Sequence, residues 1–370
     1  MKIGVLTSSR ADYGIYLPLL NELRRDSFFK LEIIAFGTHL SKSHGFTITE
    51  IEKDGFDIIH TTSSIISNDD EESIGTSYGL TVLKFVDFWK VNHYDLVLCL
   101  GDRYEMCAAV QAGISFGVKF AHIHGGETTL GAIDNIYRHQ ITHASILHFT
   151  ATSLFKNKVS NLIGSAINVH TVGSLSLYGI ENFQPINRSN FYEKFNLPNK
   201  DFALVTFHPE TVNTAMNEQF AIEMKKALSK VASKLFLVIT MPNADTMGSI
   251  FRREIAHLKD ELPEEILCIE SFGKENYFSA MFYAKVLIGN TSSGIIEAAS
   301  FGKYVVNVGD RQKGRMQSDN VINTPFNHHN ILDAVEKAIL IETPTGINKY
   351  YNQHSVDLII NHIKQFNEIV

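Results

Sequence analysis

Short apolar runs alternate with longer amphipathic stretches along most of the chain. Runs this short fit strands that are buried on both faces of a parallel sheet, and the amphipathic stretches between them fit helices. In the first half the runs lie at residues 2–7, 31–36, 57–60, 96–100, 118–123, 146–150 and 168–172. In the second half they lie at residues 202–207, 235–240, 266–270, 286–288 and 304–308. The pattern predicts an α/β protein.

The alternation lapses once, between residues 173 and 200. Gly173, Pro185 and Pro198 fall in polar sequence there, which is typical of a linker between domains. A chain of 370 residues is also long for a single core. We predict two Rossmann-like domains, over residues 1–175 and 200–350, which face each other across a central cleft.

The composition indicates which kinds of partner and which cellular compartment to expect. The chain is 44% hydrophobic and 20% charged, as in ordinary globular proteins, and its net charge of −7 argues against nucleic-acid binding. Its three cysteines form no Cys-x-x-Cys motif, which indicates a reducing compartment. The first apolar run is too short for a signal peptide, and no run approaches the length of a membrane helix. We expect a cytoplasmic protein without a membrane partner.

Charged side chains follow two neighbouring predicted strands of the first half. Asp102 comes just after residues 96–100, and His124 and Glu127 come just after residues 118–123. Ligands of parallel sheets bind at the carboxyl ends of the strands, where such groups can serve as acids and bases. Asp134 follows a few residues on and is a further candidate.

Structural roles are the alternative for each of these residues. Asp102 can form a surface ion pair with Arg103, and Asp134 can simply cap the helix that follows it. Glu127 can be solvated. The joint occurrence of such groups at adjacent strand ends favours a functional site.

A second candidate site lies after residues 286–288, where a small polar turn precedes a predicted helix. Ser292, Ser293 and Gly294 begin this helix, and small residues at a helix N-terminus let a phosphate approach the free N–H groups. We place Glu297 in the first turn, where it can accept hydrogen bonds from sugar hydroxyls. The alternative is that Ser292 merely caps the helix.

Three further candidates each follow a predicted strand. The loop at residues 309–315 carries Arg311, Lys313 and Arg315, which suit a diphosphate, although such a run is usually a solvated face. His208 follows the first strand of the second half, and Arg10 follows the first strand of the chain.

Taken in order, six motifs resemble those of the hydrolysing UDP-N-acetylglucosamine 2-epimerases of bacterial sialic acid synthesis. The motifs lie at residues 8–14, 101–105, 122–127, 207–211, 289–294 and 309–315. The resemblance implies a GT-B fold with the nucleotide sugar between the two domains, and a final helix, residues 353–370, that packs back on the first domain. His124 stands where non-hydrolysing relatives carry a glutamate, which favours the hydrolysing branch. Asn135 replaces an acidic residue common in relatives, which leaves Asp134 as the carboxylate there.

The resemblance also implies a reaction and its partners. UDP is eliminated across C1–C2 to give 2-acetamidoglucal, and water then adds to give N-acetylmannosamine, so the partners are a UDP-sugar and UDP. The scheme requires no metal and no cofactor. We expect a homodimer or homotetramer.

Residue roles follow from the same resemblance. The expected catalytic residues are Asp102, Glu127, Asp134 and His208. The expected substrate or UDP contacts are Arg10, His124, Asn243, Ser271, Phe272, Ser292, Ser293, Gly294, Glu297 and Arg315.

Three alternatives remain open. A GT-B glycosyltransferase would share the fold and the diphosphate site but would need an acceptor. A non-catalytic nucleotide-sugar sensor would bind without turnover. Within the family, the substrate can instead be a UDP-diacetamido-trideoxyhexose (diacetylbacillosamine), as in legionaminic acid synthesis.

Overall fold

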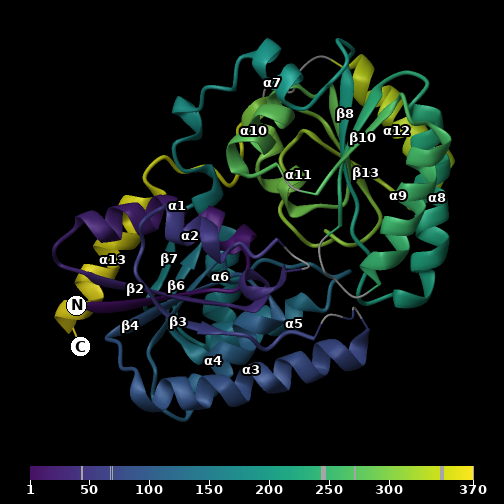
Figure 1. Ribbon diagram of the computed structural model, residues 1–370. Coiled ribbons are helices and arrows are strands. Elements are labelled where there is room, and N and C mark those ends of the chain that lie inside the picture. Colours follow the sequence, from purple (N-terminus) through teal and green to yellow (C-terminus); the bar gives the residue numbers. More distant parts are fainter. Residues whose placement is uncertain are drawn as a thin grey trace. The chain divides into compact units, whose positions relative to one another are not determined.

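The computed structural model describes residues 1–42, 45–66, 68, 70–242, 247–270, 272–341 and 346–369. The chain divides into two compact units (Figure 1). Unit 1 comprises Met1–Glu127, Asp134–Gly179 and Tyr350–Val370, and unit 2 comprises Thr128–Ile133 and Ile180–Lys349.

Unit 1 contains a seven-stranded parallel sheet in the order β3-β2-β1-β4-β5-β6-β7. Its strands are β1 (Lys2–Thr7), β2 (Lys30–Phe36), β3 (Ile58–Thr62), β4 (Leu96–Leu100), β5 (Phe120–Ile123), β6 (Ser145–Thr150) and β7 (Val169–Thr171). The strand order reverses direction between β1 and β4. In doubly wound sheets a ligand binds at such a switch point, outside the carboxyl ends of the strands.

Helices cover both faces of this sheet. They are α1 (Arg10–Arg25), α2 (Ile48–Lys53), α3 (Glu71–Val91), α4 (Tyr104–Ile114), α5 (Asp134–Ala144), α6 (Ser153–Ile163) and α13 (Ser355–Ile369). Alternate side chains of β4 enter two different cores, because successive residues of a strand point to opposite faces. Leu98 packs in the core that contains residues of α1 and α13, and Val97 packs with residues of α3 and α4. The last helix of the chain therefore belongs to the same core as the first (Figure 1).

Unit 2 contains a six-stranded parallel sheet in the order β10-β9-β8-β11-β12-β13. Its strands are β8 (Phe202–Thr206), β9 (Phe236–Thr240), β10 (Ile266–Ile269), β11 (Val286–Gly289), β12 (Val305–Val308) and β13 (Val321–Thr324). Its helices are α7 (Arg188–Lys194), α8 (Asn217–Val231), α9 (Gly248–Glu261), α10 (Lys274–Tyr283), α11 (Ser292–Ile296) and α12 (His328–Leu340). Here the order reverses between β8 and β11, which is the switch point of this sheet.

The predicted fold class is confirmed: both units are Rossmann-like α/β structures with parallel sheets. Three elements escaped the prediction, and one of them is helix α12, which follows the last predicted strand. Part of the presumed linker is helix α7, which places Phe191 and Tyr192 in the core of unit 2. Strand β13 lies at the sheet edge and has a single buried residue, so it lacks an apolar run. Among the described helices, none is long and apolar enough to span a membrane.

Candidate active site

Two charged segments of unit 1 meet at the ends of β4 and β5. Leu100 and Ile123, the last residues of these strands, are register partners, so Asp102 and His124 follow neighbouring strand ends. The Gly101 N–H donates to the Ile123 carbonyl at 3.0 Å and holds the two turns together. His124 has a φ of 66°, a left-handed conformation that few residues other than glycine adopt.

His124 is paired with Glu127 inside the protein. Its Nδ1 atom lies 2.7 Å from Glu127 Oε1, and both side chains are buried. Because a carboxylate only accepts, we place the proton on Nδ1. His124 Nε2 is buried and has no hydrogen-bond partner among the described residues. This nitrogen is therefore available to a ligand.

Arg138, on α5, connects these groups. Its side chain is 2% exposed, and it donates to the His124 carbonyl oxygen at 2.8 Å. Its Nη2 atom is ion-paired with Asp102, and its Nη1 atom, which makes the bond to the His124 carbonyl, lies 3.9 Å from Glu127 Oε2. The pairing of Asp102 with Arg103 that the sequence left open does not form, because Arg103 pairs instead with the buried Glu105 at 2.8 Å. One buried cation thus faces two carboxylates.

Sequence reasoning did not single out His122, which supports the site from within β5. Its Nε2 donates to the Gly101 carbonyl at 2.8 Å, and its Nδ1 lies 3.0 Å from Thr142 Oγ1. Burial lowers the pKa of His122 to about 3, so the ring is neutral at neutral pH. The sequence signal that could have indicated this role is a histidine inside the apolar run at residues 118–123.

The two remaining candidates of unit 1 lie at helix starts. Arg10 is the first residue of α1 and follows β1, the neighbour of β4. Ser9 caps this helix, and Asp12 accepts from the Ser8 and Ser9 N–H groups at 2.9 and 3.1 Å. Asp134 is the first residue of α5, where the helix dipole favours a carboxylate.

In unit 2, Asn290 joins the ends of β8 and β11. Its side chain accepts from the His208 N–H at 2.7 Å and donates to the His208 carbonyl at 2.8 Å. A Cβ on Gly289, whose φ is 146°, would lie 1.7 Å from the Thr206 carbonyl oxygen, so only glycine fits there. His208 is buried beside this junction.

The turn after β11 differs from the prediction in two respects. Thr291, not Ser292, caps α11, and its Oγ1 accepts from the Ser293 N–H at 3.4 Å. Ser292 is the first helical residue, and Gly294 is buried in the same turn. The prediction that Glu297 lies in the first turn is wrong, because α11 has only five residues and Glu297 is its C-cap.

Glu297 has two charged or polar neighbours from α10 that the sequence did not reveal. Burial lowers the pKa of Lys274, and the nearby Glu297 carboxylate opposes this shift. Burial raises the pKa of Tyr277, whose hydroxyl bonds to Ser293. Phe272, just before α10, is a core residue that stacks on Phe191, with ring centroids 6.3 Å apart. Asn243 and Ser271 lie outside the described residues.

The loop at residues 309–315 is tied to both strand ends of the switch point. Gln312 Nε2 donates to the Asn290 carbonyl at 2.9 Å, and the Asp310 N–H donates to Glu210 Oε1 at 2.9 Å. Burial raises the pKa of Glu210. Glu210 and Arg315 both line an open cavity of about 620 Å³ beside the loop. The predicted cations Lys313 and Arg315 therefore lie on a loop whose backbone is well anchored.

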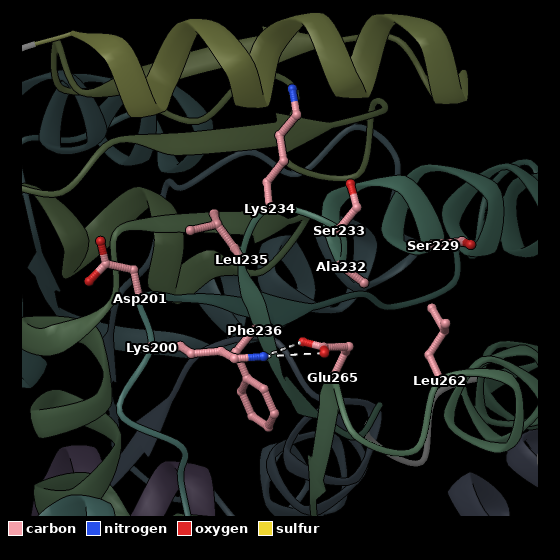
Figure 2. A pocket seen from close by; sticks show the side chains of 10 residues that line it. All are labelled: Lys200, Asp201, Ser229, Ala232, Ser233, Lys234, Leu235, Phe236, Leu262 and Glu265. Carbon is pink, nitrogen blue, oxygen red and sulfur yellow. Dashed lines mark hydrogen bonds and ion pairs between the residues drawn. The ribbon is translucent and has the colours of Figure 1, made fainter.

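A second hollow of about 490 Å³ lies at the opposite, amino edge of the unit 2 sheet (Figure 2). Its Lys200 and Glu265 pair with each other at 3.1 Å, and Lys234 extends away from it towards Glu336. Because Lys200 and Glu265 pair with each other and Lys234 points elsewhere, we assign no chemistry to this hollow. Across the described part of the chain, no cluster of three or more His, Cys, Asp or Glu is arranged to hold a metal ion.

Comparison with known proteins identifies the family of the chain. The sequence model of the UDP-N-acetylglucosamine 2-epimerase family matches residues 21–364. Polysialic acid biosynthesis protein P7 of Escherichia coli is 33% identical over 99% of this chain and 94% of its own. The hydrolysing GDP/UDP-N,N'-diacetylbacillosamine 2-epimerase of Campylobacter jejuni is 33% identical over 88% of this chain and 85% of its own.

A solved structure shares the fold. The UDP-GlcNAc 2-epimerase of Methanocaldococcus jannaschii, in complex with UDP-GlcNAc and UDP, has a TM-score of 0.81 at 16% identity. The match covers 99% of this chain and 100% of that one. By its sequence and its fold, the chain belongs to the UDP-N-acetylglucosamine 2-epimerase family.

Proposed function

We propose that the protein is a hydrolysing UDP-sugar 2-epimerase that converts UDP-N-acetylglucosamine and water into UDP and N-acetylmannosamine. The observation that carries this proposal is the buried group at the ends of β4 and β5, in which Arg138 holds Asp102 and lies near the His124–Glu127 pair. Proton transfer at carbon needs acids and bases held in such a fixed arrangement. Family membership supports the choice of a nucleotide sugar.

The reaction has two balanced stages. A base takes the C2 proton while the C1–O bond breaks, so that UDP leaves and a C1–C2 double bond forms. Water then adds its hydroxyl to C1, and a proton returns to C2 on the opposite face. Because the C2 proton is poorly acidic, departure of the diphosphate runs ahead of proton loss, and the enzyme must stabilise the leaving charge.

Exposure separates the roles of the two inner carboxylates. The Asp102 side chain is 23% exposed, so a bound sugar can reach it, whereas Glu127 is 1% exposed. We therefore assign direct proton transfer to Asp102, with Asp134 as the second candidate. Glu127 acts through His124, whose Nε2 faces the ligand and whose orientation the carboxylate maintains.

The diphosphate is assigned to unit 2. The turn at Ser292, Ser293 and Gly294 offers backbone N–H groups, and Arg315 offers a cation. With five residues, α11 has little dipole, so local N–H groups rather than the helix dipole make the contacts. Glu297 is assigned to the ribose hydroxyls, and His208 is assigned to the sugar or the diphosphate.

The hydrolysing branch is part of the proposal. The motif resemblance places His124 at the position of a glutamate in the non-hydrolysing relatives, which supports this branch. A C. jejuni relative with 33% identity is named a hydrolysing diacetylbacillosamine 2-epimerase. This relative makes UDP-N,N'-diacetylbacillosamine the alternative substrate, since the polysialic acid relative is equally similar at 33%.

Turnover of both UDP-sugars in deuterium oxide, followed by product NMR, tests the proposal. We expect UDP and N-acetylmannosamine with deuterium at C2, and faster turnover of UDP-N-acetylglucosamine than of the diacetylated sugar. Unlabelled N-acetylglucosamine would show simple hydrolysis at C1 and refute the mechanism. A UDP-linked epimer formed without release of UDP would show the non-hydrolysing reaction. The reverse substrate preference would select the alternative substrate.

A further inference from the structure

The six residues between Glu127 and Asp134, two carboxylates of the proposed active site in unit 1, belong to unit 2. Glu127 and Asp134 are in unit 1, but Thr128–Ile133 clusters with unit 2. The chain thus leaves unit 1 directly after one carboxylate and returns at the next. We call Thr128–Ile133 the strap.

Three hydrogen bonds anchor the strap to loops of unit 2. The Leu130 N–H donates to the Lys313 carbonyl at 2.9 Å, and the Thr211 N–H donates to the Gly131 carbonyl at 3.2 Å. The Ile133 N–H donates to Thr211 Oγ1 at 2.9 Å. Thr211 therefore binds the strap twice, once through its backbone and once through its hydroxyl.

The strap also packs directly on the backbone of the loop at residues 309–315. A Cβ on Gly131 would lie 2.6 Å from the Asp310 carbonyl oxygen and from Arg311 Cα. A Cβ on Gly314 would lie 2.9 Å from Thr128 Cγ2. The contacts of Gly131 are with backbone atoms, which cannot yield by a change of rotamer. The strap therefore follows any displacement of this loop.

The same loop is the one assigned to the diphosphate. It carries Arg315, and Gln312 ties it to the Asn290 carbonyl, just before the Ser292 turn. Six residues of chain span at most about 20 Å when extended, so Glu127 and Asp134 are constrained at both ends of a short, anchored segment.

We propose that the strap couples diphosphate binding in unit 2 to the position of Glu127 and Asp134, with Thr211 and Gly131 as positioning residues. This inference rests on the proposed function. Nucleotide that orders the 309–315 loop also orders the strap, and hence the two carboxylates. By thermodynamic linkage, weakening the strap weakens the coupling without removing any group that touches the nucleotide.

Thr211→Val tests the coupling, because it removes the hydroxyl acceptor of the Ile133 N–H and keeps the shape and the backbone bond. We expect kcat to fall roughly 10- to 100-fold, the cost of a small misplacement, while KM and UDP affinity by calorimetry stay near wild type. Thr211→Ser should restore kcat because it restores the acceptor. Thr76→Val, which alters an exposed threonine on α3, is the matched control.

Hydrogen–deuterium exchange gives a readout that does not depend on turnover. In the wild type, UDP should slow exchange of the peptide spanning residues 127–134, and Thr211→Val should abolish this slowing while UDP still binds. Gly131→Ala should do the same because of its clash. Gly79→Ala, where a Cβ meets nothing within 4 Å, is its control.

The outcomes separate the two proposals. If the wild type binds UDP and turns over, but Thr211→Val matches Thr76→Val in kcat and in exchange, the strap proposal alone is overturned. It is also overturned if Thr211→Val loses as much UDP affinity as Arg315→Ala does, because Thr211 would then belong to the binding site. A wild type that binds no UDP overturns both proposals.

Discussion

Arg138, on α5, is ion-paired with Asp102, 36 residues earlier in the chain, at the end of β4. The same guanidinium donates to the carbonyl of His124 at 2.8 Å. A single buried side chain thus sets the separation of two strand ends that carry the proposed acid and base groups. The two contacts use the two terminal nitrogens of the guanidinium. A lysine, with a single ammonium nitrogen, would not present this planar pair of donors.

Arg138→Met should destabilise the protein strongly. The substitution keeps most of the volume but leaves Asp102 and the buried Glu127 without their cation, which typically costs about 3–5 kcal/mol. Urea unfolding measures the change in the free energy of unfolding. Arg253→Met removes the ion pairs of a half-exposed guanidinium with Glu218 and Glu254 and should cost only about 0–1 kcal/mol. Equal effects of the two substitutions would refute the central role of Arg138.

Arg315→Ala and Ser292→Ala should each weaken UDP binding. Arg315→Ala removes the guanidinium, and Ser292→Ala removes the side-chain hydroxyl beside the backbone N–H groups; each is a donor to a charged acceptor, an interaction worth roughly 1.5–3 kcal/mol per bond. Isothermal titration calorimetry measures the affinity, with Ser233→Ala, at the amino edge of the same sheet, as the control. Unchanged UDP affinity in both variants would rule out the proposed diphosphate site.

Asp102→Asn, Glu127→Gln and Asp134→Asn should keep UDP affinity and lose turnover. The diphosphate contacts assigned to unit 2 remain, whereas loss of a positioned acid or base costs about 10²- to 10⁴-fold in rate. A variant impaired mainly in hydration should release 2-acetamidoglucal, which NMR detects. Asp319→Asn, an exposed change, is the control. Full activity in any one of the three variants would remove that residue from the mechanism.

Buried histidines should make the protein less stable in mild acid. Burial lowers the pKa of His122 to about 3 and that of His148 to about 4, from 6.5 in the unfolded chain. Between pH 6.5 and about 4 the unfolded chain therefore binds protons that the folded protein excludes. The free energy of unfolding should fall as pH falls through this window and keep its full value above it.

Urea unfolding at several pH values measures this slope. His122→Gln should reduce it, since the amide can still donate to the Gly101 carbonyl but does not titrate. His93→Gln is the matched control, because His93 is exposed and its ring stays solvated in the folded protein. A slope that His122→Gln leaves unchanged would show that His122 is not a source of the acid sensitivity.

The sequence by itself determined the fold class and most of the strands. Runs such as residues 96–100 and 235–240 form strands that are buried on both faces. Their apolar composition is a local property of the sequence, and runs this short are typical of buried strands. It also placed Asp102, His124 and His208 at strand ends, because a motif that follows an apolar run lies at its carboxyl end. It failed at β13 and α7, where too few residues are buried to form a pattern.

Only the tertiary structure decided how these residues combine. Asp102 pairs with Arg138 rather than with its sequence neighbour Arg103, because α5 packs beside the strand ends and delivers a guanidinium to that carboxylate. The role of Gly131 likewise depends on the backbone of Arg311, far along the chain. Apolar periodicity reports which face of an element is buried, but not which distant element covers it. Ion pairs and close backbone contacts between remote segments are therefore decided by packing alone.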